Sequence, residues 1–301
     1  MEQLVECIPN FSEGRRPAVI EAIAAVVVRT PGVRLLGVQS DTSHNRCVLT
    51  FVGSPEAVKG AALAATRRAV ALIDMNQHHG EHPRVGAVDV IPFVPLAGVR
   101  MEDCVAIARA LGREIWTELR VPVFFYAEAA TQPERQRLAT IRKGEYEGLP
   151  TKLADPAWVP DVGNPSPHPT AGVTVVGARQ PLIAYNVNLI TEDVEIARKV
   201  ARAVRASSGG LEHVQAIGVR NARGSAQVSV NLLDFTKTPL ARVFEFIQRE
   251  ATQYGVEIAD SEIVGLVPLA AIADVARSAL RLAGFGREQI LEARLMDLDE
   301  P

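Results

Sequence analysis

Cysteine is scarce in this chain, and the three that occur lie far apart. Cys7, Cys47 and Cys104 are set among apolar residues, and their odd number does not suit a disulfide framework. Small secreted proteins that depend on disulfides use many paired cysteines. We therefore expect three buried, reduced thiols and a cytoplasmic protein. A nucleophilic role for Cys7, just before Pro9 and Asn10, is the alternative.

The chain also lacks an excess of positive charge and a long apolar run. Its net charge is −3 with Lys and Arg scattered, which argues against a nucleic-acid partner. The apolar stretch 22–28 is far shorter than the roughly 20 residues of a spanning helix. An acidic start, Met-Glu-Gln-Leu-Val-Glu, predicts no export signal. We expect neither nucleic acid nor a membrane as a partner.

The 301 residues, 48% of them apolar, are enough for about two globular domains. Period-two and period-3.6 patterns alternate along both halves. In the first half they predict strands at 4–8, 35–38, 48–52, 87–94 and 121–126, and helices at 17–28, 55–75, 102–119 and 133–142. In the second half they predict strands at 182–189, 214–219, 226–232 and 256–263, and helices at 193–204 and 239–254.

Each half therefore contains the order β-α-β-β-α-β, a recurrent plan of a sheet with helices on one face. The predicted fold class is α/β (α+β), with two ferredoxin-like subdomains at residues 1–178 and 179–301. Helices would cover the outer face of each sheet. Packing the halves together would leave a ligand crevice between them.

A proline-rich segment at residues 149–172 separates the two patterns. Its six prolines oppose regular helix and central strand. A solvated linker would be rich in Ser or Glu, whereas this segment contains Trp158, Val159, His168 and Thr170. We expect an ordered segment that lines a pocket.

Residues 78–82, His-His-Gly-Glu-His, hold three of the six histidines. Imidazole titrates near neutrality, so such a cluster handles protons or binds a metal. Gly80 and Pro83 break regular backbone around His82 and place it in a loop, where functional residues concentrate. A carboxylate on one ring nitrogen would set the tautomer and raise the pKa of His82.

The metal alternative is a zinc hydrolase that uses His78, Glu81 and His82. These residues fit H-x-x-E-H, in which both histidines lie on one helical face. Gly80 at the centre and Pro83 after the motif oppose that helix. The sequence therefore favours proton chemistry and no metal.

Several longer motifs occur in a recognisable order. They are Leu-Val-Glu-Cys-Ile-Pro-Asn-Phe-Ser-Glu-Gly (4–14), His-Asn-Arg (44–46), Gly-Glu-His-Pro-Arg-Val-Gly-Ala-Val-Asp (80–89), Gly-Val-Thr-Val-Val-Gly-Ala-Arg (172–179), Ala-Tyr-Asn-Val-Asn-Leu (184–189), Ala-Gln-Val-Ser-Val-Asn-Leu-Leu-Asp-Phe (226–235) and Val-Gly-Leu-Val-Pro (264–268). Together they resemble glutamate formimidoyltransferase from about residue 2 to residue 295.

The resemblance implies transfer of a formimino group between N-formimino-L-glutamate and tetrahydrofolate, a step of histidine degradation. It implies two α/β subdomains with folate, the co-substrate, held between them, and a homodimer. His82 matches the catalytic histidine. The folate-binding segment matches residues 163–172, most clearly at Gly163, Pro169 and Gly172. Its residues are Gly163, Asn164, Pro165, Ser166, Pro167, His168, Pro169, Thr170, Ala171 and Gly172.

This sequence departs from the animal members in two respects. Those members continue into a cyclodeaminase, so we expect that second activity to be absent here. They have an aspartate at the position of Gln39, where this chain has Asp41 and His44 nearby. The acidic helper of His82 is therefore open between Asp41 and Asp89.

Both expected small-molecule substrates are anions, and Arg is the preferred partner of a carboxylate. Asparagines on strands can recognise the edges of a pterin ring, although structural hydrogen bonding explains them equally well. The candidate binding residues outside 163–172 are Asn10, His44, Arg46, Arg84, Arg179, Asn186 and Asn188.

General acid–base catalysis by one histidine would suffice for this transfer. A carboxylate such as Asp41 or Asp89 could stabilise the cationic amidine. Two alternatives stay open beside the zinc hydrolase. One is formyl transfer to or from folate on the same scaffold, and the other is a folate carrier without chemistry.

Overall fold

The structure, a computed structural model, describes residues 3–221 and 223–298. The chain separates into two compact units between Gln180 and Pro181, and each is described by itself. No helix within the described ranges combines the length and apolar character that a membrane span needs. The predicted ligand crevice between the halves stays a prediction.

The first unit contains a seven-stranded sheet. Its strands are β1 (Leu4–Cys7), β2 (Asn10–Phe11), β3 (Val33–Asp41), β4 (Arg46–Gly53), β5 (Val88–Ala97), β6 (Val123–Ala127) and β7 (Thr174–Ala178). Both β1 and β2 pair antiparallel with β4 and β5, so they form one strand that is interrupted at Ile8–Pro9. Proline has no backbone N–H to donate to the ladder. Beyond β5 the sheet is parallel, with β7 between β5 and β6.

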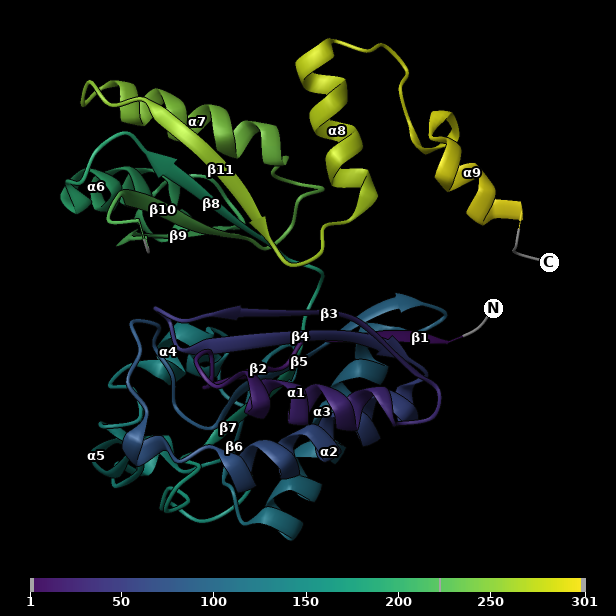
Figure 1. Ribbon diagram of the computed structural model, residues 1–301, viewed down its shortest axis with the longest axis vertical. Helices are drawn as coiled ribbons and strands as arrows, with labels where there is room; N and C mark the ends of the chain where they lie inside the picture. The colour runs from purple at the N-terminus through teal and green to yellow at the C-terminus, as the bar shows by residue number, and fades with distance from the viewer. Residues whose placement is uncertain (1–2, 222, 299–301) are drawn as a thin grey trace. The chain divides into compact units, whose positions relative to one another are not determined.

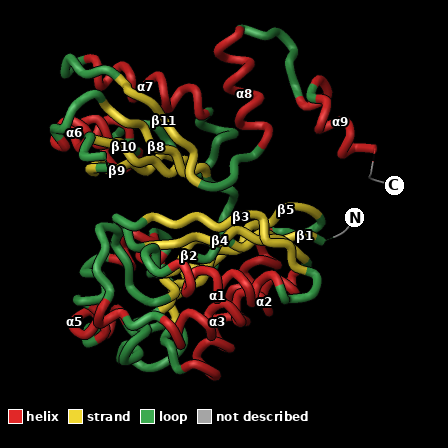
Figure 2. The backbone as a smooth tube through the Cα atoms, viewed as in Figure 1, coloured by secondary structure: helices red, strands yellow, loops and turns green. Residues whose placement is uncertain are grey.

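Three helices cover one face of this sheet, as Figure 2 shows. They are α1 (Pro17–Val28), α2 (Pro55–Leu72) and α3 (Met101–Leu119). The first two begin with a proline, whose fixed φ suits the first helical turn. Side chains that alternate along the strands, such as Val5, Cys7 and Phe11, are fully buried against these helices. All three cysteines are free and buried, as predicted.

The strand residues that alternate with these core residues lie on the opposite face of the first sheet. Next to β6 and β7 it is covered by the segment that contains α4 (Leu138–Arg142), α5 (Leu149–Leu153) and the 3₁₀ turn Pro156–Trp158. Elsewhere on this face polar and apolar residues are mixed. The cross-strand pair Asp41–Arg46 and the row Gln39, Val48 and Asn10 lie there.

The sequence-based element assignment for this unit needs three corrections. The predicted helix at 133–142 is a 3₁₀ turn at Pro133–Arg135 followed by the short α4. The 149–172 segment contains the one-turn helix α5, because Pro150 occupies its first turn, where a proline is tolerated. Strand β7 was not predicted. Its residues are buried on both faces, so its sequence has no polar alternation.

The second unit contains a four-stranded antiparallel sheet in the order β11-β8-β10-β9. The strands are β8 (Ile183–Leu189), β9 (Val214–Arg220), β10 (Ala226–Leu232) and β11 (Ile258–Val264), and the helices are α6 (Val194–Val204), α7 (Leu240–Thr252), α8 (Leu269–Leu280) and α9 (Leu291–Leu298). The first six elements confirm the predicted order β-α-β-β-α-β. Figure 1 shows both sheets and their helices, which confirms the mixed α/β class.

In this sheet the residues of β8 divide cleanly between two faces. Ile183, Tyr185 and Val187 are buried in the core with α6 and α7. Asn186 and Asn188 lie on the opposite face with their cross-strand partners, as the alternation in the sequence predicted.

Candidate active site

The loop that carries His82 runs from the 3₁₀ turn Met75–Gln77 to β5 and is fastened to the turn between β3 and β4. The backbone N–H of Glu81 donates to the carbonyl of Ser43 over 3.2 Å. The Asn45 side chain donates to the carbonyl of His79 over 3.1 Å. A Cβ at Gly80 would lie 2.2 Å from the carbonyl oxygen of His44, so only glycine allows this approach. The fold thereby fixes the loop beside Arg46.

His82 contacts an arginine. Its Nε2 lies 2.7 Å from Nη1 of Arg46, which can only donate. We therefore assign the lone pair to Nε2 and the proton to Nδ1, an assignment from the network of hydrogen bonds. Nδ1 is buried and without a hydrogen-bond partner among the described residues. The ring of His44 packs edge-on, with the centroids 5.7 Å apart.

The environment of His82 keeps its imidazole neutral. Burial is the main cause that lowers its pKa, and the charges of Arg46 and Arg142 and the nearby His44 lower it further. The expectation that a carboxylate partner raises this pKa is therefore not met. A neutral imidazole with its lone pair on Nε2 is a base, and its conjugate acid would give up the proton readily.

The two candidate carboxylates contact neighbours of His82. Asp89 forms a buried ion pair with Arg142, and its other oxygen accepts from the backbone N–H of Val85 over 2.9 Å. Asp41 accepts from the backbone N–H of His44 over 2.8 Å. No hydrogen bond or ion pair in the described part of the chain joins either carboxylate to His82. They act on Arg46, Arg142 and His44, which in turn surround the imidazole.

Arg46 lies on the face of the first sheet opposite α1, α2 and α3, at the start of β4. Burial and the charge of Arg142 lower its pKa to about 10. It forms no ion pair within 4 Å in the described residues, although Asp41 and Asp89 act on it from a distance. Arg46 is half-buried, and within the described residues its one side-chain hydrogen bond is to a neutral imidazole, so the site keeps an unneutralised positive charge.

Arg179 lies on the same face, directly after β7, and its charge reaches two buried groups. Burial raises the pKa of the Tyr126 hydroxyl and of the Glu6 carboxyl, and Arg179 opposes both shifts. Asn10 lies on this face too, and its side chain donates to the carbonyl of Ile8 over 2.9 Å. The structure therefore brings Asn10, Arg46 and Arg179 to the face that carries His82.

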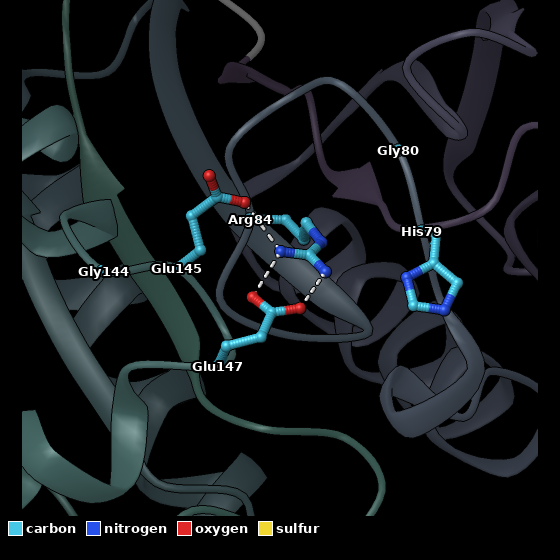
Figure 3. Close-up of a pocket in the computed structure, with 6 residues that line it drawn as sticks. All are labelled: His79, Gly80, Arg84, Gly144, Glu145 and Glu147. Atoms are coloured by element: carbon cyan, nitrogen blue, oxygen red, sulfur yellow. Dashed lines mark hydrogen bonds and ion pairs between the residues drawn. The ribbon is translucent and has the colours of Figure 1, made fainter.

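Arg84 was predicted to bind substrate, but in the structure its side chain holds other protein groups together. Its Nε donates to Nδ1 of His78, and its two terminal nitrogens donate to Glu145, Glu147 and the carbonyl of His78, over 2.6–3.2 Å. It forms one wall of a cavity of about 410 Å³ (Figure 3). The guanidinium fork of Arg84 joins the His82 loop to residues 145–147, and all five of its N–H groups are used, so no donor is left for a ligand.

His78 is part of the same structural network. Its Nε2 donates to the carbonyl of Asn45 over 2.8 Å, and its Nδ1 accepts from Arg84. The pKa of His78 is lowered, chiefly by burial. Residues 78–82 form a loop, so the helical geometry of H-x-x-E-H does not arise. In the described part of the chain, no cluster of three or more His, Cys, Asp or Glu residues could hold a metal ion.

The 163–172 segment is ordered and belongs to the first unit. Its end pairs with the strand region, since Ala87 donates to the carbonyl of Ala171 over 3.0 Å. Its earlier part lines a second cavity of about 460 Å³. The cavity residues are Trp116, Arg120, Asn164, Ser166, Pro167, His168 and Pro169. Trp116 and Arg120 escaped the sequence-based prediction because they come from α3 and its C-cap, more than 40 positions before the segment.

Asn186 and Asn188 lie in the second unit within a polar network. Asn188 donates to Asp260 over 2.5 Å and accepts from Asn221 and Gln227, each over 2.9 Å. Asn186 donates to Glu262 over 3.0 Å. They stabilise the helix-free face of the second sheet.

Two family models match the chain. Residues 4–179 match the formiminotransferase domain, N-terminal subdomain, and residues 184–284 match the formiminotransferase domain. Glutamate formimidoyltransferase of Streptococcus pyogenes serotype M1 is 49% identical over 298 residues, which are 98% of this chain and 100% of that protein. Glutamate formimidoyltransferase of Thermoplasma acidophilum is 46% identical over 295 residues, 97% of each chain.

A third relative is longer than this chain. Formimidoyltransferase-cyclodeaminase of Mus musculus is 50% identical over 283 residues, which are 92% of this chain and 52% of that protein. This chain therefore spans about half of the animal relative and essentially the full length of the two microbial ones. The matches cover both units, including the His82 loop and the sheet face around it. The chain belongs to the formiminotransferase domain family.

Proposed function

We propose that this protein is a glutamate formimidoyltransferase. It moves the formimino group of N-formimino-L-glutamate to tetrahydrofolate and releases L-glutamate and 5-formimidoyltetrahydrofolate. The observation that carries the proposal is His82, a neutral imidazole whose lone-pair nitrogen is held at a cationic sheet face. The similarity to glutamate formimidoyltransferases over nearly the full chain supports it.

The chemistry requires two proton transfers. N5 of tetrahydrofolate attacks the amidine carbon, a new C–N bond forms, and Nε2 of His82 takes the N5 proton. The tetrahedral intermediate then collapses, the bond to the glutamate nitrogen breaks, and His82 returns the proton to that nitrogen. The cations that keep His82 neutral make its protonated form a strong acid, which favours the second transfer.

Both substrates bind through carboxylates in this proposal. Arg46 and Arg179 are the arginines available on the His82 face, whereas Arg84 is saturated. Residues 163–172 are the proposed folate contact. Their cavity adds the indole of Trp116 and the guanidinium of Arg120, which suit an aromatic ring with an attached carboxylate. The homodimer and the cytoplasmic location implied by the family belong to this proposal as well.

The test replaces the base in the intact protein. His82→Gln should lower kcat by about 10²–10⁴-fold while tetrahydrofolate still binds. The matched control is His79→Gln, an exposed histidine in the same loop, which should keep wild-type turnover. Wild-type turnover by His82→Gln would refute the assignment.

The same assay separates the alternatives. N-formyl-L-glutamate in place of the formimino donor distinguishes formyl transfer. Loss of activity with a chelator, restored by zinc, would indicate the hydrolase. Folate binding without any turnover would indicate a carrier.

A further inference from the structure

A second arginine adjoins the His82 site, and the sequence motifs did not single it out. Arg142 ends α4 and pairs with Asp89 across 53 positions of the chain. The side chain of Arg142 is 13% exposed and that of Asp89 is 2% exposed. Through its charge Arg142 lowers the pKa of both Arg46 and His82. The two guanidinium groups and the imidazole therefore form one electrostatic cluster.

This cluster has donors without acceptors. The Nε of Arg142 and the Nδ1 of His82 are buried and have no hydrogen-bond partner among the described residues. Within the described residues Arg46 has no ion pair, and Asp89 already accepts from Arg142 and from Val85. Native proteins rarely leave buried donors unpaired, and such exceptions often mark a place for a ligand group. The guanidinium groups of Arg46 and Arg142 therefore have donors that suit an anionic acceptor.

The substrate chemistry indicates which anion it is. In an N-formimino amino acid, the reacting nitrogen and the α-carboxylate are bonded to the same carbon. A donor that places this nitrogen at Nε2 of His82 must place its α-carboxylate within a few ångströms, and Nη1 of Arg46 lies 2.7 Å from Nε2. A carboxylate is also a better acceptor for a guanidinium than a neutral imidazole is.

We propose that Arg46 and Arg142 bind the α-carboxylate of the amino-acid donor, and that this carboxylate draws Arg46 away from Nε2 and so releases His82 as a base. In the free protein the lone pair of His82 is occupied by Arg46. Donor binding frees the base at the moment when it is needed. This inference rests on the proposed function. It adds a basis for specificity toward donors with an α-carboxylate, and a step that activates His82.

The charges around His82 support such a release. The groups that face it or its direct neighbours are Arg46 on β4, Arg142 on α4, His44 and Asp41 at the turn, and Asp89 on β5. Asp89 is neutralised by Arg142, and Asp41 is half-exposed, so the balance near the imidazole is positive. An added carboxylate offsets that charge and raises the pKa of His82 toward its ordinary value.

The first experiment compares two donors. N-formimino-4-aminobutyrate has the reacting nitrogen and the distal carboxylate of the glutamate donor but lacks the α-carboxylate. With the wild-type protein it should show kcat/KM about 10- to 100-fold lower, the loss expected when a guanidinium loses a charged partner. Arg142→Gln should lower kcat/KM about tenfold or more for N-formimino-glutamate, but less than about twofold for the truncated donor.

Matched variants keep this comparison interpretable. Arg68→Gln removes an exposed arginine on α2 and should behave as wild type with both donors. Arg142→Gln leaves Asp89 buried without a cation. The double variant Asp89→Asn/Arg142→Gln removes both charges and should show the same donor selectivity as Arg142→Gln. Equal losses for both donors would overturn the inference. Absence of turnover by the wild type with N-formimino-glutamate would instead refute the proposed function.

The second experiment leaves both Arg46 and Arg142 unchanged. The full chain, labelled with ¹⁵N at histidine, is titrated with L-glutamate in the absence of folate, and His82 is assigned by its absence in His82→Gln. Glutamate should shift the Nε2 resonance, which reports loss of the Arg46 hydrogen bond, and raise the pKa of His82. 4-Aminobutyrate should do neither. An unchanged Nε2 resonance at saturating glutamate would overturn the inference.

Discussion

Arg84→Met should destabilise the first unit by breaking the fork that joins the His82 loop to residues 145–147. The side chain of Arg84 is 7% exposed, and its inner donors reach Nδ1 and the carbonyl oxygen of His78, each over 3.2 Å. Two such buried hydrogen bonds contribute about 0.5–1.5 kcal/mol each.

The carboxylate partners contribute less. The side chains of Glu145 and Glu147 are 42% and 61% exposed, so solvent screens these ion pairs to about 0–1 kcal/mol each. The expected total loss is therefore about 1–5 kcal/mol of the free energy of unfolding. Because Arg84 restrains the loop that carries His82, kcat should fall as well.

Urea unfolding followed by tryptophan fluorescence measures this loss. Both tryptophans of the chain, Trp116 and Trp158, lie in the first unit, so the signal reports that unit alone. Arg84→Lys should lose part of the stability, since an ammonium cannot form the fork. Arg68→Met, an exposed change on α2, is the control. A stability of Arg84→Met within about 0.5 kcal/mol of wild type, the usual scatter of surface substitutions, would refute the reasoning.

Two further predictions concern stability. Because burial lowers the pKa of His82 and His78, below pH about 6.5 the unfolded chain binds protons that the folded chain excludes. The free energy of unfolding should therefore fall as the pH decreases, by up to about 1.4 kcal/mol per pH unit for each histidine. Urea midpoints between pH 7.5 and 5.5 should show a shallower slope for His82→Gln, and identical slopes would contradict this. Lys152 donates to the carbonyls of Thr140, Ile141 and Lys143 over 2.5–3.1 Å and lies 4.0 Å from the Trp158 ring centroid. Lys152→Met should therefore lower the free energy of unfolding by about 2 kcal/mol and alter Trp158 fluorescence. The exposed control Lys143→Met should do neither. Unaltered stability and fluorescence of Lys152→Met would show that these hydrogen bonds to the end of α4 do not stabilise the unit.

The sequence predicted well where a local pattern reports burial. The alternation in β8 placed Asn186 and Asn188 on one face, and the element order of the second unit followed from periodicity. The same reasoning missed β7, because a strand buried on both faces has no alternation to detect. It also predicted one helix at 133–142, where the structure has a 3₁₀ turn at Pro133–Arg135 and the short α4.

The partner of His82 could not be found by the same means. Hydrogen-bond partners depend on strand register and on long-range packing, and neither is encoded in the spacing of neighbouring residues. Arg46 reaches His82 from 36 positions away, and Arg142 reaches Asp89 from 53 positions away. A carboxylate was the natural expectation for a catalytic histidine, whereas the fold supplies a cation.

The residues alone determined that the histidine lies in a loop, since Gly80 and Pro83 disfavour regular backbone on either side of it. Only the tertiary structure decided its protonation state. Packing the loop against the β3–β4 turn and α4 withdraws the imidazole from water and surrounds it with guanidinium groups. Desolvation and like charge then both favour the neutral form, for a physical reason that no sequence motif contains.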